Sequence, residues 1–169
     1  MVLFIIKMYH HIGLLFTKVK YKLCYGKKIV WGKDIYLRSN FKLIIENKGK
    51  VIIGNNCFFN NYCSITSLNS VKIGKDSIFG EGVKIYDHNH KFNNYNVKIS
   101  EQGYNVGSVY VGNNCWIGSN AVLLKNAKIG DNCVIGAGCI ISTTIPNNSI
   151  VTGNRNLKVT PIIFNHSRE

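Results

Sequence analysis

The chain has 169 residues, of which 46% are hydrophobic, so it can fold as one domain with a full core. It holds 21 basic and 8 acidic residues, a net charge of +13, which favours an anionic partner such as a membrane surface or a phosphorylated small molecule. The alternative is that these charges form a solvated surface. The sequence has no RNA-binding or helix-turn-helix pattern, which argues against nucleic acid as the partner.

Residues 1–28 form a basic and apolar segment that contains no acidic residue. Its apolar stretch is interrupted by a lysine, two histidines and a glycine, which leaves it too short and too broken for a membrane span. It also lacks the small-residue cleavage site of a signal peptide. We expect an amphipathic helix, roughly Phe4 to Leu23, that packs against the domain or a neighbouring subunit. Contact with a membrane surface is the alternative for this segment.

From residue 29 to residue 154 the sequence repeats with a step of six. An apolar residue followed by glycine recurs through it, and the first position of each six-residue unit is apolar: Trp31, Leu37, Leu43, Ile53, Phe59, Ile65, Ile73, Phe79, Ile85, Val111, Ile117, Leu123, Ile129, Ile135 and Ile141. A helix repeats near every 3.6 residues and a flat strand every 2, so a period of six fits neither. It predicts a chain that turns a corner every six residues and stacks its triangular coils at a spacing of about 4.8 Å.

The fifth position of the repeat holds small or β-branched residues, as expected for a second inward-facing slot in a narrow prism. Those residues are Cys57, Cys63, Ser77, Val83, Cys115, Ala121, Ala127, Cys133 and Cys139. Five of the six cysteines therefore occupy one structural slot, which predicts small buried side chains rather than a disulfide framework or a zinc site. Reduced cysteines fit a cytoplasmic protein.

Two breaks lie between Ile53 and Val111. The step from Ile53 to Ile73 is 20 residues, which adds two residues at a corner, and the step from Ile73 to Val111 is 38, which is one coil of 18 plus an insertion of 20. We expect this insertion at about residues 91–110. It begins directly after a histidine, and long excursions from a regular solenoid are usually functional. Residues 155–169 follow the repeat as a C-terminal tail.

Three stretches carry a family resemblance: VGNNCWIG (111–118), IGDNCVIGAG (129–138) and IPNNSIVTGN (145–154). They resemble the hexapeptide-repeat acyltransferases, within which they are most similar to the maltose and galactoside acetyltransferases and the bacterial polysaccharide O-acetyltransferases. The resemblance covers about residues 31–158. It implies an all-β fold, a left-handed parallel β-helix of about five coils with a long loop insertion and a short N-terminal helix. It also implies a homotrimer with active sites between subunits and acetyl-CoA as co-substrate, with no metal required.

The resemblance places the catalytic base at the sixth residue of the unit before the long loop. That unit starts at Ile85, so the base is His90, with His88 as the second candidate. A histidine with a pKa near neutral can take the proton of an attacking hydroxyl. Asp87 could orient a histidine, although an aspartate is also an ordinary residue for an exposed turn.

The resemblance assigns acceptor binding to Asn60 and Trp116. The alternative is that Asn60 is an ordinary residue of an exposed corner and that Trp116 packs at a subunit interface. For the acetyl-CoA groove it implies Gly118, Ser119, Gly136, Ala137, Ser142, Thr143, Arg155 and Lys158. Glycine and alanine allow a ligand to approach the backbone closely, and an amide there could stabilise an oxyanion. The family has a Thr-Lys pair where this chain has Ser142 and Thr143, so the contact of that lysine is missing here.

Other departures from the family bear on the acceptor. The loop arginine that follows the catalytic histidine in the galactoside and maltose enzymes is replaced here by the stretch KFNNYN (91–96), and a Pro-Gly corner is replaced by KNA (125–127). These differences favour a sugar of a surface polysaccharide or its precursor over a free galactoside. The rival functions are transfer to an antibiotic or an amino sugar nucleotide, a zinc-dependent carbonic anhydrase on the same coil, and a non-enzymatic trimeric scaffold. The carbonic anhydrase would need a third coil histidine, and no third histidine occurs at coil spacing.

Overall fold

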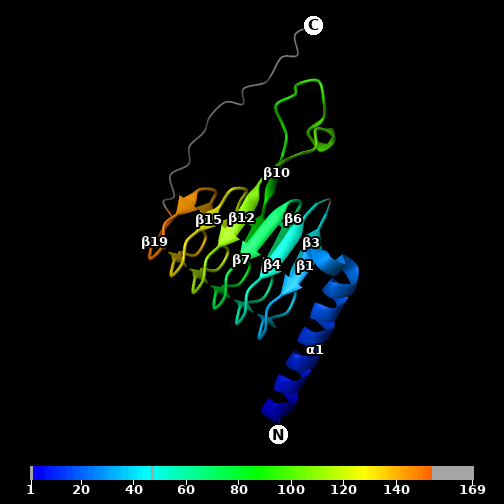
Figure 1. The fold of residues 1–169 in the computed structure, drawn as a ribbon, viewed down its shortest axis with the longest axis vertical. Coiled ribbons are helices and arrows are strands. Elements are labelled where there is room, and N and C mark those ends of the chain that lie inside the picture. Colours follow the sequence, from blue (N-terminus) through cyan, green and yellow to red (C-terminus); the bar gives the residue numbers. More distant parts are fainter. Residues whose placement is uncertain (1, 47, 154–169) are drawn as a thin grey trace.

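The computed structural model describes residues 2–46 and 48–153. A long helix, α1 (Val2–Tyr25), and a short 3-10 turn, η1 (Gly26–Lys28), lead into a stack of short strands that forms the body of the molecule (Figure 1). All strand pairs in the stack are parallel, and the one antiparallel pair of the described residues belongs to the insertion. The predicted parallel β-helix is therefore confirmed.

The strands wind through six coils. The first two coils are β1 (Ile29–Trp31), β2 (Tyr36–Leu37) and β3 (Lys42–Ile45), then β4 (Lys50–Ile53), β5 (Phe58–Phe59) and β6 (Ser64–Ser67). The next two are β7 (Ser70–Ile73), β8 (Ile78–Phe79) and β9 (Lys84–Tyr86), then β12 (Ser108–Val111), β13 (Trp116–Ile117) and β14 (Val122–Leu123). The last two are β15 (Lys128–Ile129), β16 (Val134–Ile135) and β17 (Ile140–Ile141), then β18 (Thr144–Ile145) and β19 (Ile150–Val151).

Stacking of the coils produces three flat sheets, one for each side of the prism. The first face is β1-β4-β7-β12-β15-β18, the second is β2-β5-β8-β13-β16-β19, and the third is β3-β6-β9-β14-β17. Ile73 pairs with Ile53 on one side and with Val111 on the other, so both predicted breaks in the repeat are confirmed.

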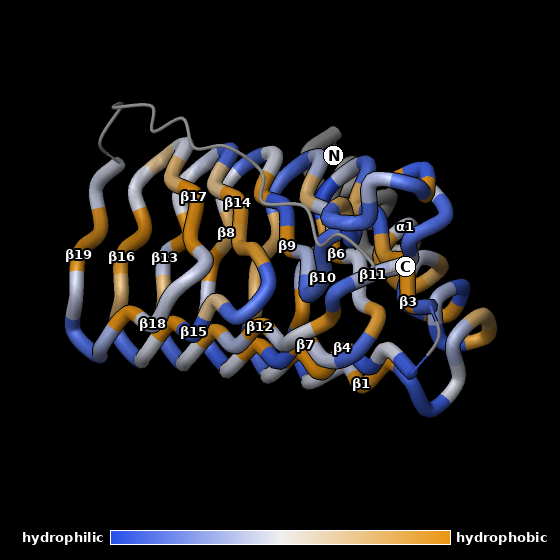
Figure 2. Tube along the Cα trace, turned by 90° about the horizontal axis from the view of Figure 1, so that it is seen from above, coloured by the Kyte–Doolittle hydropathy of each residue, from blue (hydrophilic) through white to orange (hydrophobic). Residues whose placement is uncertain are grey.

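The core is built from the two inward slots that the repeat predicts. All first-position residues are buried except Trp31, which is half-buried, and all of the fifth-position residues are buried. Figure 2 shows apolar segments stacked from coil to coil, with hydrophilic corners between them. Phe59 and Phe79 stack face to face, with ring centroids 4.4 Å apart. The five repeat cysteines are free thiols inside this core.

The stack is longer than the expected five coils because the repeat continues past residue 141 with a shorter step. Ile129 pairs with Ile145, 16 residues later, because the corner at Ser142 and Thr143 is two residues shorter than in the preceding coil. The sixth coil has strands on the first and second faces only, since the described residues end at residue 153.

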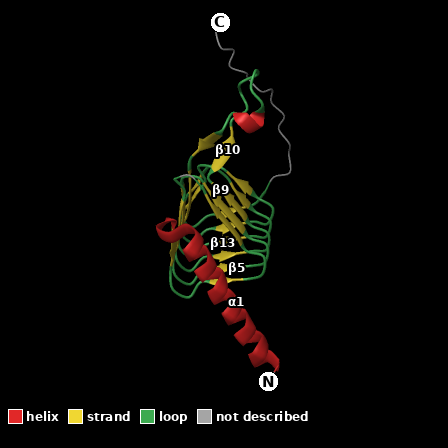
Figure 3. Ribbon diagram, turned by 90° about the vertical axis from the view of Figure 1, so that its right-hand side faces the viewer, coloured by secondary structure: helices red, strands yellow, loops and turns green. Residues whose placement is uncertain are grey.

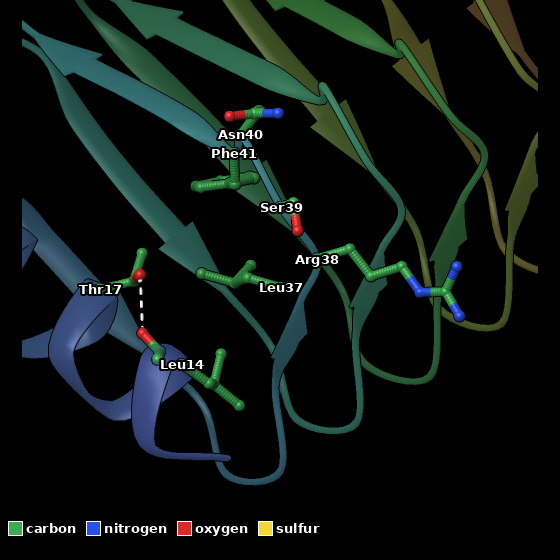
Figure 4. Close-up of a pocket in the computed structure, with 8 residues that line it drawn as sticks. Leu14, Thr17, Leu37, Arg38, Ser39, Asn40 and Phe41 are labelled. Atoms are coloured by element: carbon green, nitrogen blue, oxygen red, sulfur yellow. Dashed lines mark hydrogen bonds between the residues drawn. The ribbon is translucent and has the colours of Figure 1, made fainter. Parts of the chain in front are cut away.

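Helix α1 covers the open end of the first coil. The hydroxyl of Tyr21 donates to the carbonyl oxygen of Phe41 (3.0 Å) and accepts from the amide of Leu43 (3.1 Å). Leu14 also packs against the core, and it lines a cavity of about 200 Å³ between the helix and the corner after β2 (Figure 4). The predicted helix and its packing on the domain are confirmed, with bounds a few residues wider than expected. No helix among the described residues has the length and apolar character needed to cross a membrane.

The insertion leaves the stack at the corner between the third and first faces. It contains β10 (His88–His90), η2 (Ile99–Glu101) and β11 (Tyr104–Val106), and β10 pairs antiparallel with β11. The hairpin and its loop stand clear of the prism (Figure 3). The excursion spans residues 88–107 rather than 91–110, because Ser108 already pairs with Ser70 in the first face.

Candidate functional site

A buried carboxylate marks the corner at which the insertion begins. The side chain of Asp87 is fully buried and accepts four hydrogen bonds. Their donors are the Ser67 hydroxyl (2.7 Å), the amides of Leu68 (2.8 Å) and Asn69 (2.9 Å), and the ring of His88, whose Nδ1 lies 3.1 Å from Oδ1. These two amides belong to the corner of the preceding coil where the sequence adds two residues. The irregular corner after β6 is therefore hydrogen-bonded to the corner at which the insertion begins.

These contacts keep Asp87 ionised although it is buried. Burial by itself would raise the pKa of this carboxyl, but the hydrogen bonds from Leu68, Ser67, Asn69 and His88 together lower the pKa below its usual value. An ionised Asp87 accepts from the Nδ1–H of the His88 ring, so that in the neutral form of the ring Nε2 is the acceptor.

The two candidate histidines differ in exposure. The side chain of His88 is only 12% exposed, and its ring meets the ring of Tyr104 edge-on at 5.2 Å. His90 is exposed, and its ring centroid lies 4.6 Å from that of Tyr104. Because Tyr104 pairs with His90 across the hairpin, β11 holds an aromatic ring against both histidines.

His90 opens onto a groove of about 590 Å³ at the base of the hairpin, within the size range of small-molecule sites. Its lining residues are Asn89, His90, Lys91, Phe92, Asn93, Asn105 and Lys125. Lys125 belongs to the next coil and donates a hydrogen bond to the side chain of Asn105 (3.3 Å). The groove therefore lies between the hairpin and the coil that follows it.

A second group of predicted residues lies at the corner between the second and third faces. Asn60, Gly118 and Gly136 follow β5, β13 and β16, at the same place on coils two, four and five. The backbone amides of Asn60, Gly118 and Gly136 donate to the coils that follow them, at 3.0, 2.7 and 2.8 Å. The side-chain oxygen of Asn60 accepts from the amide of Asn61 (2.8 Å), a contact that stabilises the corner itself.

The glycines of this corner also have a packing role. A Cβ on Gly118 would lie 2.6 Å from the amide nitrogen of Ala137 in the next coil, so only glycine allows this spacing. Since the amides of Gly118 and Gly136 are already hydrogen-bonded, the backbone donors left at this corner on coils four and five are the amides of Ser119 and Ala137. Within residues 2–46 and 48–153, these two amides have no hydrogen-bond acceptor.

The predicted residues are thus separated within one chain. Trp116 is 54% exposed on the second face, beside the corner that holds Asn60 and the glycines. Asp87 and both histidines lie across the third face, at its other edge, where the exposed residues Ser142 and Thr143 form the same corner two coils later. Arg155 and Lys158 fall outside the described residues.

Three residues beside the histidines were not singled out from the sequence: Ser67, Tyr104 and Lys125. Lys125 could have been found from the repeat, because Leu123 pairs with Ile85 and so Lys125 falls at the position of Asp87, one coil later. Tyr104 could not, since its pairing with His90 depends on the fold of the hairpin.

A family model described as "Bacterial transferase hexapeptide (six repeats)" matches residues 108–143. No curated protein sequence matches the chain.

Several solved structures are similar over most of the chain. Galactoside acetyltransferase in complex with coenzyme A is 28% identical, with a TM-score of 0.65 over 75% of this chain and 60% of that one. This chain therefore spans about three fifths of the length of that enzyme. A hexapeptide-repeat acetyltransferase from Vibrio cholerae, VCA0836, is 19% identical with a TM-score of 0.65, over 80% of this chain and 74% of that one.

A mutant of AntD, an N-acyltransferase from Bacillus cereus in complex with dTDP and coenzyme A, is 17% identical with a TM-score of 0.61. It covers 83% of this chain and 87% of that one. The Vibrio and Bacillus proteins share the fold with this chain.

Proposed function

Because this chain is a hexapeptide-repeat protein with the fold of the acetyltransferases, we propose that it transfers an acetyl group from acetyl-CoA to a sugar hydroxyl. The acceptor is a sugar of a bacterial surface polysaccharide or of its precursor. The observation that carries the proposal is His90 in the groove, with His88 beside it on β10, at the longest interruption of the coil that the structure describes. The neighbour solved with coenzyme A supports acetyl-CoA as the co-substrate.

His90 acts as the general base in this proposal because it is exposed in the groove. It accepts the proton of the acceptor hydroxyl while the hydroxyl oxygen bonds to the acetyl carbon. The bond between carbon and sulfur then breaks, and His90 returns the proton to the sulfur of the departing coenzyme A. The free amides of Ser119 and Ala137 are the candidate donors to the developing oxyanion or to the amide-bearing arm of coenzyme A.

Asp87 and His88 position the hairpin in this scheme. The Asp87 carboxylate joins the corner of coil two to the first residue of β10, and His88 packs on Tyr104 of β11. His90, two residues further along β10, is thereby held at the mouth of the groove. His88 is the alternative base, since its Nε2 stays free to accept a proton.

A homotrimer would complete the site. The two groups of site residues lie on opposite edges of the third face, so a neighbouring subunit has to bring Asn60 and Trp116 towards the histidines. The second face offers an apolar contact surface for it, a ladder of outward-facing side chains: Tyr36, Phe58, Ile78, Trp116, Val134 and Ile150. Sedimentation equilibrium should give three times the chain mass, and Ile78→Glu should shift the protein to single chains.

Helix α1 is suited to contact an anionic membrane surface. Leu15, Phe16 and Leu23 are exposed on the helix, away from the side that packs on the coil. Val19 is also partly exposed and lies beside Val30 and Trp31 of β1. Lysines flank the exposed apolar residues of α1, and no acidic residue occurs before Asp34, so the segment attracts anionic headgroups and would repel copies of itself. The protein should float with vesicles that contain phosphatidylglycerol but not with phosphatidylcholine alone, and Leu23→Glu should abolish flotation. Such a contact fits a cytoplasmic enzyme at the inner face of the membrane.

The acetyltransferase proposal is tested first by titration calorimetry with acetyl-CoA. One saturable site per chain is expected, followed by thiol release when sugar acceptors are added. A folded trimer that binds no acetyl-CoA would contradict the proposal and favour a scaffold role.

A further inference from the structure

The groove beside His90 contains two lysines that have no acidic partner. Among the residues that the structure describes, no carboxylate oxygen lies within 4.0 Å of the amino group of Lys91 or Lys125. Lys125 is half-buried, and its hydrogen bond goes to the neutral side chain of Asn105. The groove thus holds uncompensated positive charge.

The acidic residue of the insertion and the one immediately before the insertion are already engaged elsewhere. Asp87 is buried behind the corner, where four donors surround it. Glu101 of the insertion lies 3.7 Å from Lys98. The remaining groove residues are asparagines, one phenylalanine and His90, so nothing in the lining neutralises the two lysines.

We propose that Lys91 and Lys125 bind a negatively charged group, a carboxylate or a phosphate, on the acceptor itself. A lysine whose amino group already donates to a neutral amide beside the groove is a suitable partner for such an anion, since charge-assisted hydrogen bonds are the stronger kind. The inference rests on the proposed acetyl transfer, because the anion can be assigned to the acceptor only if the groove is where the acceptor binds.

The phosphates of coenzyme A are the other source of negative charge, but their position argues against them. If His90 is the base, the acetyl thioester lies beside it, and the phosphates lie at the far end of the pantetheine arm. Lys91 directly follows His90, and Lys125 lines the same groove. An anion held there is close to the reacting hydroxyl. The acceptor class is therefore an acidic sugar, or a sugar that carries a phosphate.

The test compares matched acceptors in the thiol-release assay: galacturonate against galactose, and glucose 1-phosphate against glucose. We expect kcat/KM to be at least about tenfold higher for one charged member of a pair, which corresponds to one charge-assisted hydrogen bond. Because surface charges are screened by ions, added salt should weaken the preference.

Lys125→Gln removes the charge and keeps most of the side chain. It should raise the KM for the charged acceptor roughly tenfold and leave the KM for acetyl-CoA unchanged. The matched control is Lys98→Gln, an exposed lysine of the same insertion that pairs with Glu101, and it should leave both constants unchanged.

Turnover of neutral and charged acceptors at equal rates would overturn the inference and leave acetyl transfer intact. A rise in the KM for acetyl-CoA in Lys125→Gln would also overturn it, by assigning the anion to coenzyme A. If no acceptor turns over, calorimetry of galacturonate and glucose 1-phosphate with the coenzyme A-bound protein decides. Binding that Lys125→Gln weakens would support the inference, while no binding of either compound would overturn it.

Discussion

The two edges of the third face are built in different ways. The corner with the second face is regular, and its glycines and backbone amides are used coil after coil to stack the prism. The corner with the first face is irregular: it gains two residues after β6 and the whole insertion after β9, and it buries a carboxylate. Most backbone groups at the regular corner are therefore used in hydrogen bonds and packing between coils. At the irregular corner, the insertion leaves side chains such as that of His90 exposed.

The largest expected effect separates the histidines at the irregular corner. His90→Ala should lower kcat by roughly 10²–10⁴, the usual contribution of a general base. Its exposed side chain contacts Tyr104 of the hairpin and lies outside the core, so the free energy of unfolding should change by less than about 0.5 kcal/mol. His88→Ala is the matched variant, and thiol-release kinetics compare the two. A greater loss of kcat in His88→Ala would identify His88 as the base.

A second test concerns the buried carboxylate. Asp87→Asn should lower the free energy of unfolding by roughly 2–4 kcal/mol, because an amide cannot accept from all four donors that surround this side chain. Denaturant unfolding measures the change. Glu101→Gln, in the exposed loop, is the control and should change stability by less than about 0.5 kcal/mol. Equal stability of wild type and Asp87→Asn would show that the carboxylate is dispensable to the fold.

The regular corner should respond through packing. Gly118→Ala places a Cβ 2.6 Å from the amide nitrogen of Ala137, so we expect a loss of roughly 1–3 kcal/mol in the free energy of unfolding. Gly13→Ala in α1 meets no neighbour within 4 Å and should stabilise the helix by about 1 kcal/mol. Thermal unfolding of both variants checks this contrast. If the free energy of unfolding of Gly118→Ala equals that of wild type, the coils can move apart at this corner.

Acid should reduce the difference between wild type and Asp87→Asn. The pKa of Asp87 is lowered in the folded state, so its contribution to stability is present above the unfolded pKa of about 3.9 and is lost as the pH falls through the lower, folded value. The stability gap between the two proteins should therefore be constant near neutral pH and shrink below about pH 4. A gap that stays constant down to pH 2 would contradict an ionised Asp87.

The smallest expected effect concerns the cysteine slot. Cys115→Ala should cost about 1 kcal/mol, because it removes a buried sulfur from a close-packed coil and also its hydrogen bond to the carbonyl of Gly130 (3.1 Å). Cys24→Ala alters an exposed residue and should stay within about 0.5 kcal/mol of wild type. Urea unfolding measures the free energy of unfolding of both variants. Equal values for Cys115→Ala and Cys24→Ala would show that the core tolerates the loss of the sulfur.

Most of the fold could be predicted from the sequence, because the repeat itself specifies it. Each first-position side chain packs on its equivalents one coil away, so the spacing of residues such as Ile53, Ile73 and Val111 gives both the register and the breaks. The sixth coil was missed because its step shortens to 16 residues at Ile145, where a six-residue ruler fails.

The site could be predicted only in part. His88 and His90 were identified by their place before the insertion, but the four partners of Asp87 were not, since they depend on the path of an irregular corner in the coil before it. Within one chain, Asn60 and Trp116 lie across the third face from the histidines. The spacing of residues along the sequence gives their positions on the coils but not which sides of the prism face each other in the site.

The burial of the five repeat cysteines has a practical consequence. Burial raises the pKa of the Cys63 thiol to about 11 and also raises the pKa of Cys57 and Cys115, and all five side chains are almost inaccessible. Alkylating reagents attack accessible thiolates, so in the folded protein they should reach Cys24 alone. The wild-type chain can thus carry a single dye on α1, next to Leu23. Its emission colour and its quenching by lipid-borne quenchers would report whether the helix contacts a bilayer, without any engineered cysteine.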